Sequence, residues 1–215
     1  MTTLTADEEI QTLFADGTRF HTISETIKDL VYKHGFTPES NLLDVGCGYL
    51  RSTMRTIQTM TTGKVFAFDK EDRYFNGAYV KSIPVMQMVF MPNKDITTWK
   101  TKELDFSPIK DTPIHFVVAV SVLTHMELKT IDALMYKLAK VMVPGAKFFA
   151  TIFLPRKSNK PYELGRVHPH RDDEYYEVFL SPAFLKHRYA QNFDMFNLGT
   201  PLPDKRHWMI MFQRK

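Results

Sequence analysis

The sequence predicts a single α/β domain of three layers, in which helices cover both faces of a mostly parallel sheet. Apolar runs with the length of strands alternate with longer segments whose apolar residues recur at helical spacing. The first of these runs, residues 42–45, leads into two glycines, Gly46 and Gly48, and a helical segment follows. This order of strand, glycine turn and helix is typical of a chain that places backbone amides against a nucleotide-like ligand.

The elements can be placed along the chain from these patterns. Helices are predicted at 7–15, 20–32, 49–60, 72–81, 130–143 and 182–190, the last capped by Ser181. Strands are predicted at 42–45, 64–68, 85–91, 114–120, 147–154, 193–198 and 207–212. Residues 97–113 are predicted to be irregular, and residues 155–176 to form a long loop on the side where a ligand binds.

Composition limits the classes of protein that need to be considered. The chain has 215 residues, a formal net charge of +4 and 44% hydrophobic residues, enough for one core. Cys47 is the single cysteine, so an intrachain disulfide and a multi-thiolate zinc site are excluded. We expect a reducing, cytoplasmic compartment, no membrane span and no signal peptide. The mild positive charge does not by itself indicate nucleic acid as a partner.

Two acids frame the glycine turn. Asp44 lies in the first strand, and Asp69 ends the next apolar run, about 20 residues after Gly48. In open α/β sheets a carboxylate at this second place binds ribose hydroxyls. A dinucleotide site would place a third glycine where this chain has Arg51. A nicotinamide-dependent oxidoreductase is therefore a poorer alternative.

Residues 42–48 resemble motif I of the class I S-adenosylmethionine-dependent methyltransferases, hydrophobic-hydrophobic-Asp-hydrophobic-Gly-x-Gly. Residues 121–126, Ser-Val-Leu-Thr-His-Met, are similar to the segment after the fourth strand in a subset of that family, and residues 144–146 are similar to its Pro-Gly-Gly turn. The chain departs from the family at Leu50, where a glycine is usual, and at Ala146. The resemblance runs from about residue 20 to the end and implies a three-layer α/β/α sandwich with a seven-stranded sheet and an antiparallel last strand.

The resemblance also implies a cofactor, S-adenosylmethionine, and residues to hold it. The glycine turn would approach its methionine portion, Asp44 its amino group, and Asp69 its ribose. Asp95 would bind the adenine amine while Ile96 packs on the ring, although Asp95 fits a turn or helix cap equally well. The residues expected at the cofactor are Asp44, Gly46, Cys47, Gly48, Asp69, Lys70, Asp95, Ile96 and Ser121.

For the acceptor, the resemblance implies an oxygen or nitrogen of a small molecule. His125 is the candidate general base, with a structural role as the alternative. Tyr49, His168, His170 and Arg171 are expected to contact the acceptor. The His-Pro-His at 168–170 is too sparse to predict a metal site. The Asn/Asp-Pro-Pro-aromatic sequence typical of enzymes that methylate base amines is missing after the fourth strand.

Two other functions stay open: methylation of RNA or protein, and a methyltransferase-like protein that binds without turnover. Residues 1–36 are expected to form helices that cover the site, and residues 155–180 an insertion on the acceptor side. The whole chain is expected to be one domain and to act as a monomer or homodimer.

Overall fold

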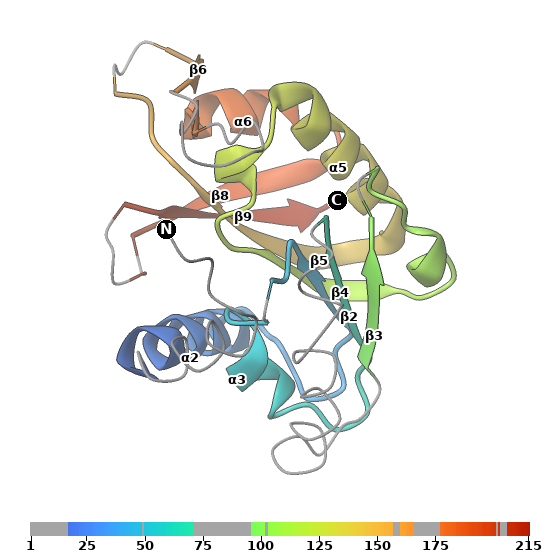
Figure 1. Ribbon diagram of the computed structural model, residues 1–215. Coiled ribbons are helices and arrows are strands. Elements are labelled where there is room, and N and C mark those ends of the chain that lie inside the picture. The colour runs from blue at the N-terminus through green and yellow to red at the C-terminus, as the bar shows by residue number, and fades with distance from the viewer. Residues whose placement is uncertain are drawn as a thin grey trace, which may run out of the picture. The chain divides into compact units, whose positions relative to one another are not determined.

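The computed structural model describes residues 17–48, 50–70, 96–101, 103–156, 160–165, 177–200, 202 and 206–215. Within these ranges the predicted fold class is confirmed. Seven strands form a mostly parallel sheet in the order β3-β2-β1-β4-β5-β9-β8, flanked by helices (Figure 1). Pairing is parallel for β1 with β2, β2 with β3 and β4 with β5, whereas β9 runs antiparallel to both β5 and β8.

The bounds of the elements follow the apolar patterns closely in most places. The strands of the sheet are β1 Leu42–Val45, β2 Val65–Asp69, β3 Ile96–Lys100, β4 Ile114–Ala119, β5 Met142–Ile152, β8 Phe193–Gly199 and β9 Trp208–Arg214. The α-helices are α2 Gly17–Lys33, α3 Met54–Ile57, α5 Leu128–Val141 and α6 Pro182–Arg188. Two short 3-10 helices are also present, η2 Ser107–Ile109 and η3 Leu123–His125. Within the described residues, no helix is both long enough and apolar enough to pass through a membrane.

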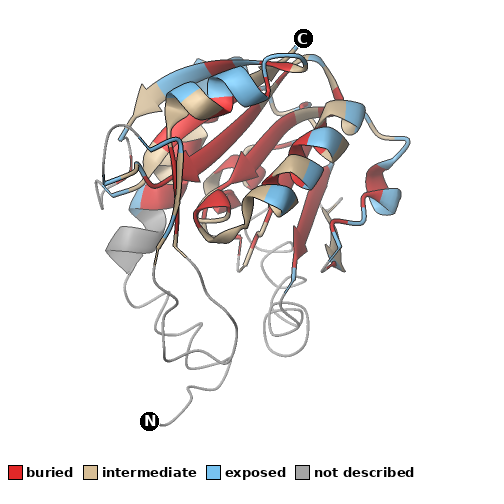
Figure 2. Cartoon of the chain, turned by 90° about the horizontal axis from the view of Figure 1, so that it is seen from above, coloured by how far each residue is buried: buried red, intermediate tan, exposed pale blue. Residues whose placement is uncertain are grey.

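The chain divides into two compact units, Met1–Asp105 and Phe106–Lys215, which we describe in turn. In the first unit every residue of β1 and β2 is buried (Figure 2). A strand covered on both faces must be apolar throughout, which is why these strands read as continuous apolar runs and not as alternating ones. Asp44 and Asp69 are the two charged residues in these strands, and both are buried.

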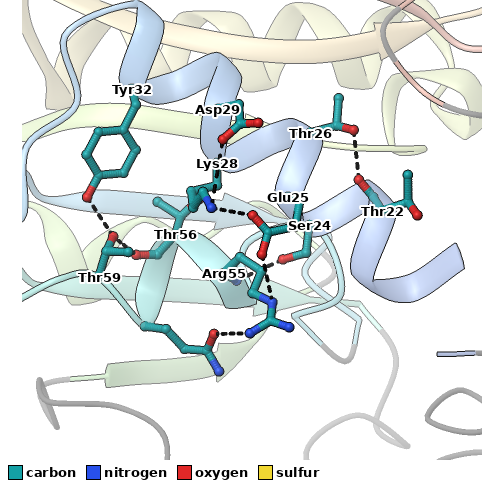
Figure 3. Close-up of polar contacts among 11 residues, drawn as sticks. Thr22, Ser24, Glu25, Thr26, Lys28, Asp29, Tyr32, Arg55, Thr56 and Thr59 are labelled. Atoms are coloured by element: carbon teal, nitrogen blue, oxygen red, sulfur yellow. Dashed lines mark hydrogen bonds and ion pairs between the residues drawn. The ribbon is translucent and has the colours of Figure 1, made fainter. Parts of the chain in front are cut away.

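Helix α2 packs on α3 within this unit, as the helical periodicity predicts (Figure 1). Polar contacts fix the pair along one side: Glu25 forms ion pairs with Lys28 and with Arg55, and the Ser24 hydroxyl accepts a hydrogen bond from the Arg55 amide at 2.8 Å (Figure 3). The Tyr32 hydroxyl donates to Thr59 Oγ1 at 2.7 Å. Helix α2 is therefore anchored to the chain segment that follows the glycine turn; its role as a cover of the site stays a prediction.

The third strand of the sheet is not where the sequence placed it. Strand β3 is Ile96–Lys100, all but its first residue lying in the stretch predicted to be irregular, and it pairs with all of β2. Its polar residues are only half-buried, as expected at the end of the strand order, so the apolar signal of a central strand is missing. The strand predicted at 85–91 and the helices predicted at 7–15 and 72–81 lie outside the described residues.

Two further boundaries differ from prediction. The helix expected at 49–60 is a turn at residues 50–53 followed by the single α-helical turn of α3. The fifth strand begins at Met142 and not at Lys147, because the chain runs straight from α5 into β5 through Pro144 and Gly145. Gly145 has φ +82°, a conformation that glycine adopts without a steric penalty. The Pro-Gly pair therefore lies within the irregular start of a strand.

The second unit contains β4, β5, β8, β9, α5 and α6, and its core is aromatic. Phe148, Phe149 and Phe212 are fully buried, and the rings of Phe148 and Phe212 stack across the antiparallel pair β5/β9 at 5.8 Å. Within the predicted insertion, Tyr162–Leu164 (β6) and Val178–Leu180 (β7) form a small antiparallel sheet that the sequence did not predict. Ser181 precedes α6 with extended backbone, at the predicted capping position, but its side chain forms no cap hydrogen bond.

Candidate functional site

The glycine turn that follows β1 has an unusual backbone. Gly46 and Gly48 have φ +64° and +48°, and Leu50, two residues further on, has φ +56°. Left-handed backbone favours glycine, which accounts for the glycine that the resembling family usually has at the position of Leu50. The Leu50 side chain is fully buried in the first unit, and this burial offsets the strain of its backbone.

Asp69 is joined to this turn by a direct hydrogen bond. Its carboxylate Oδ2 accepts from the backbone N–H of Gly48 at 3.0 Å, and its side chain lies at the end of β2, where it is nearly buried. The two features predicted to bind one ligand, the second glycine and the second acid, are therefore adjacent. A carboxylate can accept hydrogen bonds from hydroxyl groups as well as from a backbone N–H.

Asp44 is fully buried in β1, and only part of its carboxylate is satisfied. The Thr53 hydroxyl donates to Oδ2 at 2.5 Å, whereas Oδ1 has no hydrogen-bond partner among the described residues. Burial raises the pKa of Asp44 from 3.8 to about 7; the hydrogen bond from Thr53 opposes this shift and the nearby charge of Asp69 adds to it. A buried carboxylate oxygen without a donor is costly, and a bound donor would relieve that cost.

Thr53 was not singled out from the sequence, yet it is the one described donor to Asp44. Replacing it by valine, which has nearly the same shape, removes the hydroxyl without leaving a cavity. We expect Thr53→Val to lower the free energy of unfolding by about 1–3 kcal/mol at pH 8, where Asp44 is ionised, and by less at pH 5. Urea denaturation at both pH values measures this, with the exposed Thr62→Val as control; an equal loss at the two pH values would contradict it.

Cys47 lies in the turn, and its backbone N–H and carbonyl form hydrogen bonds that hold the turn in place. Its N–H donates to the Phe68 carbonyl at 3.0 Å, and its carbonyl accepts from the Leu50 N–H at 2.8 Å. Burial, and then the charges of Asp44 and Asp69, raise the pKa of the Cys47 thiol well above its usual value. The thiol is therefore protonated and unreactive, and Cys47 contributes to the site by shaping the backbone.

The remaining predicted cofactor residues of this unit are not gathered around the turn. Lys70 is exposed directly after Asp69. Ile96 begins β3 and pairs with Val65, whereas Asp69 pairs with Lys100 at the other end of the same two strands. The role expected of Ile96, packing on the adenine ring, stays a prediction. Tyr49 and Asp95 lie outside the described residues.

In the second unit, Ser121 follows β4 in a left-handed conformation with φ +60°. Its N–H donates to Thr151 Oγ1 at 2.7 Å, and its hydroxyl lies 3.0 Å from Nε2 of His207. His207 was not predicted as a site residue, since it stands alone before the last strand and belongs to no motif. The rings of His125 and His207 both contact Phe153, with centroid distances of 6.1 and 4.9 Å.

The predicted acceptor residues His168, His170 and Arg171 lie outside the described residues. Among the residues that are described, no group of three or more histidine, cysteine, aspartate or glutamate side chains is arranged to hold a metal ion. The second unit instead has a cluster of two imidazoles, a hydroxyl and aromatic rings. They come from η3 and β7 and from the residues that follow β4, follow β5 and precede β9.

Comparison with known proteins addresses the fold. No family model matches the sequence, and no curated protein matches it either. Solved structures do match. The glycopeptide N-methyltransferase MtfA complexed with sinefungin is similar over 90% of this chain and 94% of its own, with a TM-score of 0.67 and 14% identity. The chain has the class I methyltransferase fold.

A second methyltransferase supports the same assignment of the fold. The Burkholderia thailandensis 1,6-didemethyltoxoflavin-N1-methyltransferase, solved with 1,6-didemethyltoxoflavin and S-adenosylhomocysteine, matches over 100% of this chain and 92% of its own. Its TM-score is 0.64 and its identity 17%. In the class I methyltransferase fold, as in other open α/β sheets, ligands bind outside the carboxyl ends of the strands. Asp69 in the first unit and Ser121 in the second stand at such ends.

Proposed function

We propose that the chain is an S-adenosylmethionine-dependent methyltransferase that acts on an oxygen or nitrogen of a small-molecule acceptor. The observation that carries the proposal is the buried carboxylate of Asp44, whose Oδ1 has no partner among the described residues, beside a left-handed glycine turn. A cationic donor, such as the ammonium of the cofactor's methionine portion, would donate a hydrogen bond to that oxygen. The fold shared with known methyltransferases supports the same reading.

Each polar group of the turn then has a role toward the cofactor. Asp44 would accept from the ammonium, and Asp69 would accept from the ribose hydroxyls while its other oxygen stays bonded to the Gly48 N–H. Gly46 and Gly48 would let the ligand approach the backbone, since a side chain there would meet it. When bound, S-adenosylmethionine supplies a methyl group that its sulfonium makes electrophilic. The protein's own contribution is then to orient the acceptor and to exclude water.

The pKa of Asp44 adds a consequence for binding. An ammonium placed beside the carboxylate favours its ionised form and so lowers a pKa that burial holds at about 7. Binding near pH 7 should therefore release a proton, and the affinity should rise as the pH increases from 6 to 8.

The small-molecule acceptor is supported by the structural neighbours, whose names give a glycopeptide and 1,6-didemethyltoxoflavin as the substrates of those proteins. The sequence adds that the motif typical of base-amine methylation is missing after β4. An RNA or protein acceptor is the alternative, and turnover assays with acceptors of each class would distinguish them.

A thermal shift experiment tests the proposed cofactor against the nicotinamide alternative. A ligand present at about 100 times its dissociation constant stabilises by about 2.7 kcal/mol, which raises the melting temperature of a chain of this size by about 5–10 °C. We expect that rise with S-adenosylhomocysteine and none with NAD or NADP. A rise with a nicotinamide cofactor alone would reject the methyltransferase in favour of an oxidoreductase.

A further inference from the structure

We propose that Ser121 and His207 form a proton relay that deprotonates the acceptor, and that the acceptor is a phenol or a similar weakly acidic hydroxyl compound. The proposal rests on the methyl transfer proposed above and names the acceptor class for it. All the residues that carry it lie in the second unit.

The first observation is the strained backbone of Ser121. A non-glycine residue at φ +60° is uncommon and costs free energy, so it persists only where the surroundings impose it. Here the Ser121 N–H donates at 2.7 Å to the hydroxyl of Thr151, a fully buried residue of β5. Strand β5 therefore fixes the turn after β4, and the turn fixes where the Ser121 hydroxyl lies.

The second observation is the partner of that hydroxyl. Nε2 of His207 lies 3.0 Å from Ser121 Oγ, within hydrogen-bond distance. His207 directly precedes β9, whose first residue, Trp208, pairs with Ile152 of β5. The His207 ring contacts the buried ring of Phe153 at 4.9 Å, so both a hydrogen bond and a ring contact hold the imidazole. Ser121 and His207 are themselves only half-buried and can reach a ligand.

The third observation is the set of rings beside the pair. The Phe153 ring contacts the rings of His125, His207 and Phe179 at centroid distances of 6.1, 4.9 and 5.8 Å. The guanidinium of Arg206 lies over the same ring at 4.3 Å, and its charge is paired with Glu177. These aromatic surroundings suit the ring of a phenol, whose hydroxyl is acidic enough to give a proton to an imidazole.

The chemistry balances without any further reactant. With the Nδ1–H tautomer of His207, the Ser121 hydroxyl donates to Nε2. As the acceptor gives its O–H proton to Ser121 Oγ, Ser121 passes its own proton to Nε2 of His207. The acceptor oxygen uses a lone pair to form the new O–CH₃ bond, and the electrons of the broken C–S bond return to sulfur. His207 leaves the step as a cation and later releases the proton to water.

The test uses 4-nitrophenol, whose anion absorbs visible light whereas the neutral form does not. Full-length protein is titrated with 4-nitrophenol in the presence of S-adenosylhomocysteine, at a pH about one unit below the solution pKa of the phenol. We expect saturable binding, with a ratio of anion to neutral phenol at least ~10-fold higher for the bound ligand than for the free one. In His207→Gln and in Ser121→Ala we expect the bound phenol to return to the ratio of the free one.

Three variants serve as controls. His187→Gln removes an exposed histidine of α6 and should leave the ratio unchanged. Arg206→Gln separates charge stabilisation from proton acceptance, and His125→Gln tests the other imidazole on Phe153. The melting temperature of each variant shows whether it folds. The proposal is overturned if the wild type binds no nitrophenol or binds it in the neutral form. It is also overturned if His207→Gln still binds the ionised phenol, whether or not His125→Gln loses that ability.

A separate measurement shows whether the cofactor proposal, and not the relay, has failed. Calorimetry with S-adenosylhomocysteine alone reports the site at Asp44 and Asp69, and we expect His207→Gln to leave that affinity unchanged. A protein that binds S-adenosylhomocysteine but leaves nitrophenol neutral would retain the proposed function and lose the relay.

Discussion

Replacing Asp44 by asparagine is expected to abolish most of the pH dependence of the stability of this protein between pH 5 and pH 8. The native carboxyl keeps its proton until about pH 7, whereas in the unfolded chain it ionises near its ordinary value of 3.8. Between these two values the native state binds more protons than the unfolded state, so stability falls as the pH rises. Above about pH 7 both states are ionised and this contribution becomes constant.

The size of the effect follows from the same linkage. The native pKa lies about two pH units above pH 5. Over this range the free energy of unfolding of the wild type should fall by about 3 kcal/mol. Asparagine carries no charge, and its oxygen can still accept from Thr53, so Asp44→Asn should show little of this loss. Urea denaturation at pH 5 and pH 8 measures it.

Asp111→Asn serves as the control, because Asp111 is an exposed aspartate outside the turn and should leave the wild-type profile unchanged. A pH profile of Asp44→Asn that superimposes on the wild type would show that Asp44 does not carry the shift. The same variant should also bind S-adenosylhomocysteine more weakly, since the ammonium loses its counter-charge; the more stable protein at pH 8 would be the poorer binder.

Replacing Asp69 by alanine is expected to weaken cofactor binding by about 1–3 kcal/mol, or roughly 5- to 150-fold in the dissociation constant. The substitution removes the acceptor that would meet the ribose hydroxyls. It also leaves the Gly48 N–H without the carboxylate that it now bonds at 3.0 Å. The ribose hydroxyls would then leave water without gaining a partner in the protein, and this desolvation makes up most of the cost of a lost hydrogen bond.

The two consequences of this substitution can be separated. Asp69→Asn keeps an oxygen for Gly48 but removes the negative charge, so it should preserve stability better than alanine while still binding less tightly. Calorimetry gives the affinity and urea denaturation gives the stability. An unchanged affinity of Asp69→Ala, in a protein that is folded, would remove Asp69 from the binding site; Glu39→Gln, an exposed substitution, is the control.

The sequence predicts the fold well because most of its strands are buried on both faces. Residues 42–45, 65–68 and 114–119 are continuous apolar runs, and each is a strand in the structure. Strand β3 escaped this reasoning because Ile96–Lys100 lies at the end of the strand order, where half-buried polar residues are tolerated. The adenine role expected of Ile96 depended on where that strand ended, and it stays a prediction.

The candidate site also contains residues that the sequence predicts and residues that it does not. The glycines and the two acids could be predicted because their spacing follows from a turn and two parallel strand ends. Thr53 and His207 could not, since each acts through a contact distant in sequence: Thr53 is 9 residues from Asp44, and His207 is 86 residues from Ser121. A lone threonine or histidine carries no pattern, and only the folded chain shows its partner.

The central claim, that the turn between β1 and α3 binds S-adenosylmethionine, is tested most directly by titration calorimetry of the wild type with S-adenosylhomocysteine at pH 8. The account predicts one site per chain, a dissociation constant in the micromolar range, and heats that vary with the ionisation enthalpy of the buffer at pH 7 because Asp44 releases a proton. The absence of any binding heat at both pH values, for a folded protein, would contradict it.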